Sequence, residues 1–318
     1  MQITMNNHTS LLDAIHATGL EPPPYLEPGK FYRFPGHDKG RSNRAAWCLL
    51  FEDGQGGCFG DWSTGLMENW HPQREKSLSD AERAALKAKV ERARKRMQQE
   101  THQRHQHAAD RAQRIWCHCR PTPADYLYLL TKQIQPHGAG FYKGSIALPV
   151  IDFNSQLTSM QFITMTGEKL LLSGGRKQGC YIPIPATQNA QFTHNLTGWP
   201  SFADYAESAQ RIIICEGWAT GCTLAEAEPD TFVVAAIDAG NLMAVAMQAR
   251  ACLPDAEIII AGDDDRQTVG NPGTTKARAA AVAARALLAL PEWPDSYPDH
   301  LTDFNDLAVW QAGGMCHE

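Results

Sequence analysis

The sequence lacks the features that mark membrane and secreted proteins. No apolar run approaches the roughly 18 residues that a membrane-spanning helix needs, and the N-terminus has no basic stretch followed by an apolar one. The nine cysteines are an odd number without the spacing of a disulfide framework, which favours reduced thiols. These absences predict a soluble, cytoplasmic protein with no membrane partner.

Two short motifs are missing as well. No CxxC pair occurs, so the paired ligands of a zinc ribbon are absent. The cluster Cys117-His118-Cys119 has poor spacing, because alternate residues do not share a helix face, and we do not expect zinc there, although metal binding at these three residues stays open. The sequence has no GxxxxGK[ST] phosphate loop, so no ATPase or helicase motor is expected on this chain.

What is present is an ordinary globular composition with an uneven distribution of charge. Hydrophobic residues make up 43% and charged residues 20%, which argues against wholesale disorder, and 318 residues suggest two or three domains. Residues 74–114 hold twelve Lys or Arg and six Asp or Glu, a local charge of +6 within a net charge of −6. Such a basic segment is typical of contact with a phosphate backbone, but it can equally be the solvated surface of a helix.

The pattern along the chain predicts four parts. Residues 1–75 have short strand-like runs separated by Pro-Gly, Asp-Gly and Gly-Gly turns, which predict a small antiparallel β domain. Residues 76–120 are rich in Ala, Arg, Lys and Gln and predict a long basic helical linker. Residues 121–208 predict a β-rich subdomain, and residues 209–318 alternate apolar strands with helices, as in a parallel sheet covered on both faces.

The expected elements can be placed by residue number. In the first part, strands are predicted at 30–34, 46–51 and 57–62. In the β-rich part, strands are predicted at 145–151, 157–164 and 179–184. In the last part, strands are predicted at 211–215, 231–237 and 257–261, with helices at about 218–228, 240–252 and 274–290.

Carboxylates follow all three strands of the last part. Glu216 follows the first strand, Asp238 the second, and Asp263 and Asp265 the third. Because the carboxyl ends of parallel strands meet at one edge of a sheet, these side chains are expected to converge. Converging carboxylates repel one another unless a cation neutralises them, and oxygen ligands select Mg²⁺ or Mn²⁺. The alternative is that they cap helices and turns, which suits Asp264 and Asp238 well.

These residues carry a family resemblance. The order Ile-Ile-Cys-Glu216-Gly217 and then Asp263-x-Asp265 resembles the Toprim domain of primases and topoisomerases. Further stretches resemble plasmid- and phage-type DNA primases over nearly the whole chain: Phe59-Gly-Asp-Trp-Ser-Thr-Gly65, Tyr126 to Gly138, Ala147 to Asp152, Gly167-Glu-Lys169 with Ser173-Gly-Gly175, Asp238 to Leu242, and Asp303 to Leu307. The resemblance implies an α/β Toprim core with a Rossmann-like parallel sheet, joined to the other three parts.

The resemblance also implies a function and a site. A primase of this type makes short primers on single-stranded DNA from nucleoside triphosphates, for replication of a plasmid, a phage or another mobile element. Glu216 would be a general acid/base or metal ligand, and Asp263 and Asp265 would hold catalytic Mg²⁺ or Mn²⁺. Asp303 or Asp306 would add a carboxylate. With no motor on this chain, unwinding would come from a separate replicative helicase.

Basic residues of the β-rich part are candidates for nucleotide and template contact. In related primases this part contributes such residues, and here Lys169, Arg176 and Lys177 are the local ones. The alternative is an ordinary solvated basic turn.

The N-terminal part departs from the zinc ribbon with which many related primases begin. Its strands combine aromatic residues with Arg33, Lys39, Arg41 and Arg44. Basic side chains can follow a phosphate backbone while an aromatic ring such as Trp62 stacks on an unpaired base. The competing interpretation is that most of the aromatic residues form the small core of this sheet.

Two other functions fit the sequence less well. The chain could be a non-catalytic single-stranded-DNA-binding replication-initiation module whose Toprim fold is structural, but it retains Glu216, Asp263 and Asp265. It could instead use Asp263-Asp264-Asp265 as the phosphoacceptor of a receiver-like domain, which the long basic and β-rich preceding segment disfavours. We therefore predict a DNA primase.

Overall fold

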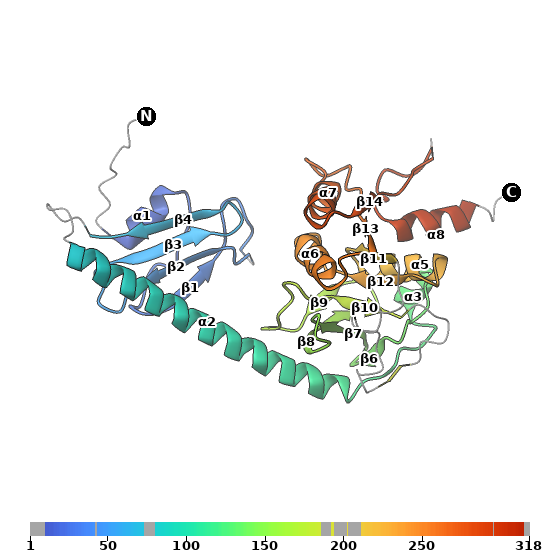
Figure 1. The fold of residues 1–318 in the computed structure, drawn as a ribbon, viewed down its shortest axis with the longest axis horizontal. Coiled ribbons are helices and arrows are strands. Elements are labelled where there is room, and N and C mark those ends of the chain that lie inside the picture. The colour runs from blue at the N-terminus through green and yellow to red at the C-terminus, as the bar shows by residue number, and fades with distance from the viewer. Residues whose placement is uncertain are drawn as a thin grey trace. The chain divides into compact units, whose positions relative to one another are not determined.

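A computed structural model describes residues 10–41, 43–72, 80–185, 192–193, 202, 211–294 and 296–314. The chain divides into two compact units, 1–102 and 103–318 (Figure 1). The helix α2, Asp80–Trp116, runs from the first unit into the second. Most of its residues are charged or polar or are alanine, as expected for this segment. Among the described residues, no helix is both long enough and apolar enough to cross a bilayer.

The first unit is a four-stranded antiparallel sheet with one short helix. The helix α1, Leu11–Ala17, begins at a capping box in which Ser10 and Asp13 bond each other's backbone amides. The strands lie in the order β1-β2-β3-β4: β1 Phe31–Phe34, β2 Ala46–Leu50, β3 Gly57–Asp61 and β4 Leu66–Trp70. The first three strands match the predicted ones, whereas α1 and β4 were not predicted.

The two faces of this sheet differ. On one face Phe34, Cys48 and Phe59 are buried against Leu11 and Ile15 of α1 and form the core of the unit. Side chains alternate along a strand, and the register pairs Phe31 with Leu49 and Arg33 with Trp47, so these four residues lie on the opposite face.

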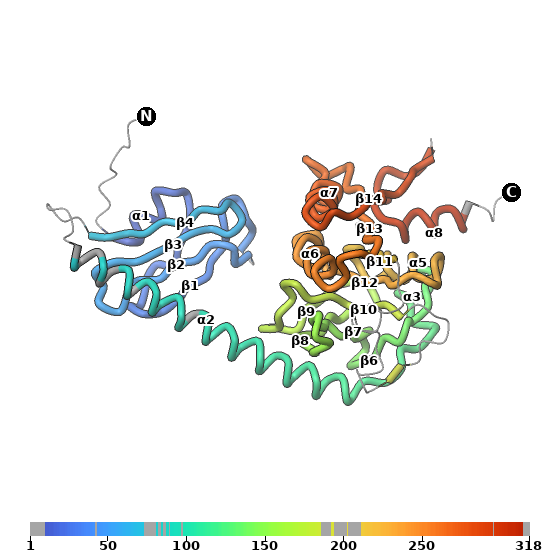
Figure 2. The backbone as a smooth tube through the Cα atoms, viewed as in Figure 1, coloured from blue at the N-terminus to red at the C-terminus, as the bar shows by residue number. Residues whose placement is uncertain are grey.

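The second unit contains two five-stranded sheets (Figure 2). The first is antiparallel in the order β5-β6-β7-β8-β9: β5 Arg120–Pro121, β6 Gly140–Tyr142, β7 Ser145–Ile151, β8 Leu157–Ile163 and β9 Lys169–Leu171. One face of β7 (Ile146, Leu148 and Val150) packs toward the second sheet, while Ala147 on the other face packs against Trp116 at the end of α2. The helix α3, Leu127–Lys132, lies between β5 and β6 in the chain.

The second sheet has the order β10-β12-β11-β13-β14, with β10 antiparallel and the others parallel. Its strands are β10 Ile182–Ile184, β11 Arg211–Cys215, β12 Phe232–Ala235, β13 Glu257–Ala261 and β14 Leu287–Ala289. The helices are α5 Trp218–Ala227, α6 Leu242–Cys252, α7 Pro272–Ala284 and α8 Phe304–Gly314. Helices α6 and α7 cover one face and α5 lies on the other, as Figure 1 shows. The predicted fold class, a Rossmann-like parallel sheet beside a β-rich subdomain, a long helix and a small β domain, is confirmed.

Two expected elements differ from the observed ones. The strand predicted at 179–184 is shorter, and as β10 it pairs with β12 of the parallel sheet, while Tyr181 just before it makes an isolated antiparallel bridge to Ile151 at the end of β7. The helix predicted at 274–290 begins at Pro272 and ends at Ala284, because Arg285 takes a left-handed conformation with φ 51° and the following residues form β14. A run of alanine and leucine gives no signal for that break.

Candidate active site

Adjacent parallel strands bring the predicted carboxylates to one edge of the sheet. The register aligns Cys215, the last residue of β11, with Ala235 of β12 and Ala261 of β13. Glu216 follows β11 directly, and Asp263 follows β13 after one glycine. The strand ends therefore place the two carboxylates at the same edge of the sheet, one residue apart in register.

The electrostatics of these groups are those of a crowded acidic site. Burial and the charges of Glu216, Asp303 and Asp265 together raise the pKa of Asp263 to about 8. Burial also raises the pKa of Glu216, and a hydrogen bond from the Ala239 amide acts against burial. Four carboxylates thus lie within electrostatic reach of one another.

A cation fits this arrangement. The Oδ1 atom of Asp263 is buried and has no hydrogen-bond partner among the described residues, which is costly unless a ligand occupies it. Within the described parts of the chain, no three His, Cys, Asp or Glu side chains are close enough to cage an ion on their own. Mg²⁺ commonly binds through one or two carboxylates together with substrate phosphates, so an open carboxylate site suits it.

Asp265 is held at the N-terminus of α7. Its Oδ2 accepts a hydrogen bond of 2.9 Å from the Gly273 amide, where the helix dipole favours negative charge. A Cβ atom on Gly273 would lie 2.7 Å from the Asp263 carbonyl oxygen and 2.8 Å from Asp265 Oδ2. Only glycine therefore allows this close approach of the helix to the loop that carries both aspartates.

Asp303 and Asp306 differ in their surroundings. Asp303 Oδ2 accepts a hydrogen bond of 3.1 Å from the Thr220 hydroxyl of α5, and its charge acts on Asp263. Asp306 instead pairs with Lys132 at 2.9 Å and accepts from the Thr302 amide. Of the two carboxylates, the structure brings Asp303 into the acidic site and engages Asp306 in an ion pair beside it.

Lys169 reaches the acidic site from β9 of the antiparallel sheet. Its charge lowers the pKa of both Glu216 and Asp263, and its Nζ would lie 3.4 Å from a Cβ atom on Gly217. A cavity of about 550 Å³ opens beside it, lined by α3, the β8–β9 turn and α5, with Asp303 and Thr220 at its wall. The predicted basic residue thus lies between the carboxylates and a cavity large enough for a nucleotide.

Arg176 and Lys177 make separate ion pairs. Arg176 binds Asp152 at 2.6 Å, and Lys177 binds Asp238, whose charge acts on Glu216. Of these two residues, Lys177 is therefore the one that borders the acidic site.

Asn241, which the sequence reasoning did not single out, fixes the Lys177 loop. It is fully buried, accepts from the Gly179 amide at 2.8 Å, and donates to the carbonyls of Lys177, Cys180 and Ala236. These bonds join the loop before β10 to the end of β12. The position within Asp238 to Leu242 was noted, but three of the four partners of Asn241 lie about 60 residues away and left no local signal.

Asp264, the middle residue of the acidic triplet, points away from its neighbours. Its carboxylate accepts from Asn271 at 2.7 Å and from the Trp293 indole at 3.0 Å, and pairs with Arg266. Its amide donates to the Thr302 carbonyl at 2.7 Å, which brings the Asp303 segment to the site. The expected structural role suits these contacts.

In the first unit, two of the predicted DNA-contacting residues, Trp62 and Arg33, belong to an aromatic stack. The Trp62 side chain is 52% exposed, its ring stacks on Trp47 at 5.8 Å, and the Arg33 guanidinium lies 4.8 Å above it. Arg33 and Arg44 also donate to carbonyl oxygens of the loop between β1 and β2. Lys39 and Arg41 are exposed on that loop.

The buried Asp61 positions this loop. Asp61 accepts from the His37 amide at 2.8 Å and from the amide and hydroxyl of Ser63. Gly60 leaves room for the Trp47 ring, which would lie 3.0 Å from a Cβ atom there. The Phe-Gly-Asp-Trp stretch is thus the end of β3 and the first residue of the turn that follows it, and it orients an aromatic face.

The two cysteines of the Cys117-His118-Cys119 cluster differ in their exposure to solvent. Cys117 is exposed, whereas Cys119 is buried, and burial together with the nearby Cys117 raises the pKa of the Cys119 thiol to about 11. The His118 ring contacts the Arg114 carbonyl at 2.7 Å.

Comparison with known proteins identifies the second part of the chain. Residues 211–314 match the Toprim domain family. Two DNA primases named TraC, both from Escherichia coli, are 32% and 31% identical over 277 and 260 residues, covering 79% and 74% of this chain. The chain spans only 24% and 17% of the length of these curated relatives.

Solved structures give weaker similarities. The primase fragment of the bacteriophage T7 primase-helicase protein has 11% identity and a TM-score of 0.39, and the match covers 90% of this chain and 98% of that one. The DnaG primase catalytic domain bound to single-stranded DNA has 14% identity and a TM-score of 0.34, over 62% of this chain and 57% of that one.

Proposed function

Because residues 211–314 form a Toprim domain and most of the chain is homologous to the DNA primase TraC, we propose that this protein synthesises primers on single-stranded DNA. The observation that carries the proposal is the meeting of Glu216, Asp263 and Asp265 at the ends of adjacent parallel strands. The unpartnered, buried Oδ1 of Asp263 supports a metal-dependent reaction.

One or two of the carboxylates of Asp263, Asp265, Glu216 and Asp303 would hold the metal together with substrate phosphates, and Asp306 is held beside them by Lys132. A bound Mg²⁺ or Mn²⁺ would supply positive charge for positioning the incoming triphosphate and for neutralising the charge that develops toward pyrophosphate. Asp264 keeps the loop in place through Trp293.

The nucleotide site is the cavity beside Lys169. Lys169 contacts the triphosphate, and Lys177 and Arg176 line the path of the template from their positions beside Asp238 and Asp152. The primer 3′-oxygen forms a bond to the α-phosphorus while the bond to pyrophosphate breaks. Glu216 would take the hydroxyl proton, a role that is supported by the burial that raises its pKa.

The template extends over the first unit. Trp62 stacks on an unpaired base, while Arg33, Lys39, Arg41 and Arg44 follow the phosphates. A separate replicative helicase supplies unwinding, and the protein serves a plasmid, a phage or another mobile element in the cytoplasm.

The decisive experiment is de novo primer synthesis on single-stranded DNA with labelled nucleotides and Mg²⁺ or Mn²⁺. Wild type is compared with Glu216→Gln, Asp263→Asn and the control Asp255→Asn, an exposed aspartate before β13. We expect short products from wild type and the control only. Equal product from Asp263→Asn would refute the site, and single-stranded-DNA binding without product in any protein would favour a non-catalytic module.

A further inference from the structure

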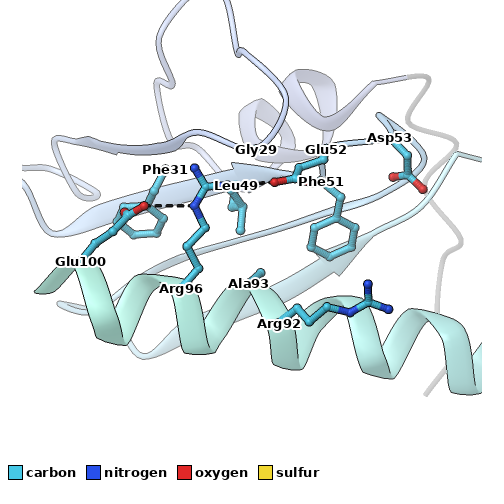
Figure 3. A pocket seen from close by; sticks show the side chains of 10 residues that line it. All are labelled: Gly29, Phe31, Leu49, Phe51, Glu52, Asp53, Arg92, Ala93, Arg96 and Glu100. Atoms are coloured by element: carbon cyan, nitrogen blue, oxygen red, sulfur yellow. Dashed lines mark hydrogen bonds and ion pairs between the residues drawn. The ribbon is translucent and has the colours of Figure 1, made fainter. Parts of the chain in front are cut away.

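The first unit contains a cavity of about 320 Å³ between its sheet and the first half of α2. Figure 3 shows its two walls: Phe31, Leu49 and Phe51 project from the sheet, and Ala93 and Arg96 project from the helix. Phe51 and Leu49 are 5% and 6% exposed, so the apolar wall is firmly packed. The cavity therefore has an apolar floor made of two phenylalanines and one leucine.

The polar rim of the cavity holds an arginine in a fixed position. Arg96 Nη1 donates to Glu52 at 2.8 Å, and its Nε donates to Glu100 at 3.1 Å. Gly29 at φ 77° allows Glu52 this position, because a Cβ there would lie 2.9 Å from Glu52 Cγ. Asp53 and Arg92 complete the rim (Figure 3).

The charged groups of the rim determine which kind of ligand fits the cavity. Three carboxylates and two guanidinium groups surround the cavity, which disfavours a triphosphate but offers several acceptors and a few donors. The edge of a nucleobase carries matching groups, and its flat face suits the phenylalanine rings. A volume of about 320 Å³ accommodates one nucleotide base with its sugar and excludes a folded partner.

The cavity also adjoins the aromatic stack described above. Phe31 lines the cavity and stacks on Trp47 at 5.8 Å, and Trp47 stacks on Trp62. The rings form one continuous track along this face of the sheet. A strand whose bases stack on the outer rings can thus place its next base in the cavity.

We propose that this cavity, the Arg96 cavity, receives one unpaired base of the single-stranded template and reads its edge. The proposal rests on the proposed function, since it assumes that the first unit engages the template. Because carboxylates dominate the rim, a base with an exocyclic amino group fits better than thymine: cytosine donates from N4, where thymine has a carbonyl.

The test uses the full chain and measures binding of dye-labelled dC and dT 12-mers by fluorescence anisotropy, with no nucleotide or metal. We expect wild type to bind dC about 5–20-fold more tightly than dT, since one good base contact gives discrimination of about this size. Ala93→Leu should fill the cavity and remove that preference, whereas Ala84→Leu, on an exposed position of α2, should keep it.

A second pair of variants guards against misfolding. Glu52→Gln changes one rim acceptor and should reduce the preference for dC, while Glu68→Gln, exposed on β4, should not. Equal binding of the two oligonucleotides by wild type, or a preference that survives both Ala93→Leu and Glu52→Gln, would overturn the proposal. Because these measurements need no synthesis, they are independent of the Asp263→Asn result that decides the proposed function.

Discussion

At the scale of single residues, the acidic site works against the folded state when no metal is bound. Burial and three neighbouring carboxylates raise the pKa of Asp263 to about 8 from its ordinary value of 3.8. The folded protein therefore holds this proton more tightly than the unfolded chain does, and metal-free stability falls as pH rises from about 4 to 8. The arrangement of carboxylates that can hold a cation therefore lowers the free energy of unfolding when no cation is bound.

Asp263→Asn removes this dependence. We expect the variant to gain on the order of 1–4 kcal/mol in unfolding free energy at pH 8 without metal, and little at pH 4. Chemical denaturation at both pH values measures the gain, and Mg²⁺ should stabilise wild type but not the variant. Asp255→Asn is the control. If Asp263→Asn were no more stable than wild type at pH 8, the inferred repulsion among the carboxylates would be wrong.

Gly273 offers a test of geometry without a change in charge. In Gly273→Ala the new Cβ would lie 2.7 Å from the Asp263 carbonyl, so the loop that carries Asp263 and Asp265 must shift. Displacement of reacting groups by about 1 Å costs roughly 100-fold in rate, and we expect a loss of about 10–100-fold in primer synthesis. Gly313→Ala in α8, with no heavy atom within 4 Å, should retain full synthesis.

The residues of this site differ in how far the sequence could predict them. Glu216, Asp263 and Asp265 were predictable because parallel strands end together, so position in the pattern fixes position in space. Asn241 was not, because its partners are carbonyl groups of a distant loop. A polar side chain that bonds distant backbone groups leaves no recognisable pattern in a single sequence.

At the scale of secondary-structure elements, a hydrogen bond between His137 and Glu226 joins the loop after α3 to α5. The His137 ring is 3% exposed, and its two nitrogens lie 2.9 Å from the Pro185 carbonyl and 2.9 Å from Glu226 Oε1. The Gln-Pro-His-Gly stretch thus connects α3, β10 and α5.

Glu226→Gln tests this connection. Burial pushes the pKa of Glu226 up, but hydrogen bonds from His137 and the Gln135 amide outweigh burial and leave it below 4.5. The carboxylate therefore stabilises the fold above about pH 4.5 and loses that effect as pH falls further.

We expect Glu226→Gln to cost about 1–3 kcal/mol at pH 7 and less below pH 4.5. Denaturation curves at several pH values measure the cost, with exposed Glu292→Gln as the control. A cost that is independent of pH would show that the carboxylate charge contributes nothing.

Element types were predictable where periodicity was strong, and sheet membership was not. The apolar runs of β11 and β13 were predicted with their observed ends. The run that contains β10 is apolar on both faces, so it fits either sheet, and the backbone pairing with β12 decides. Local pattern predicts a strand but cannot choose its neighbour.

At the scale of the whole molecule, the two units divide the work in the proposed function. The aromatic face of the first unit engages the template, and the acidic site of the second carries out synthesis. Because the two sites are separate, a variant that disrupts DNA binding should keep its acidic site intact, and a variant of the acidic site should keep DNA binding. Two single variants of this chain test this.

Trp62→Ala should weaken binding of single-stranded DNA by about 5–100-fold, because stacking of a base on an aromatic ring contributes roughly 1–3 kcal/mol. Tyr25→Ala, which removes an aromatic ring that is 68% exposed elsewhere in the first unit, is the control and should bind as wild type does. Asp263→Asn should bind DNA normally while it makes no primer. Anisotropy titrations and primer synthesis with the same preparations measure both effects. If Asp263→Asn lost binding and synthesis together, the template would have to depend on the acidic site as well, and the proposed division between the units would be wrong.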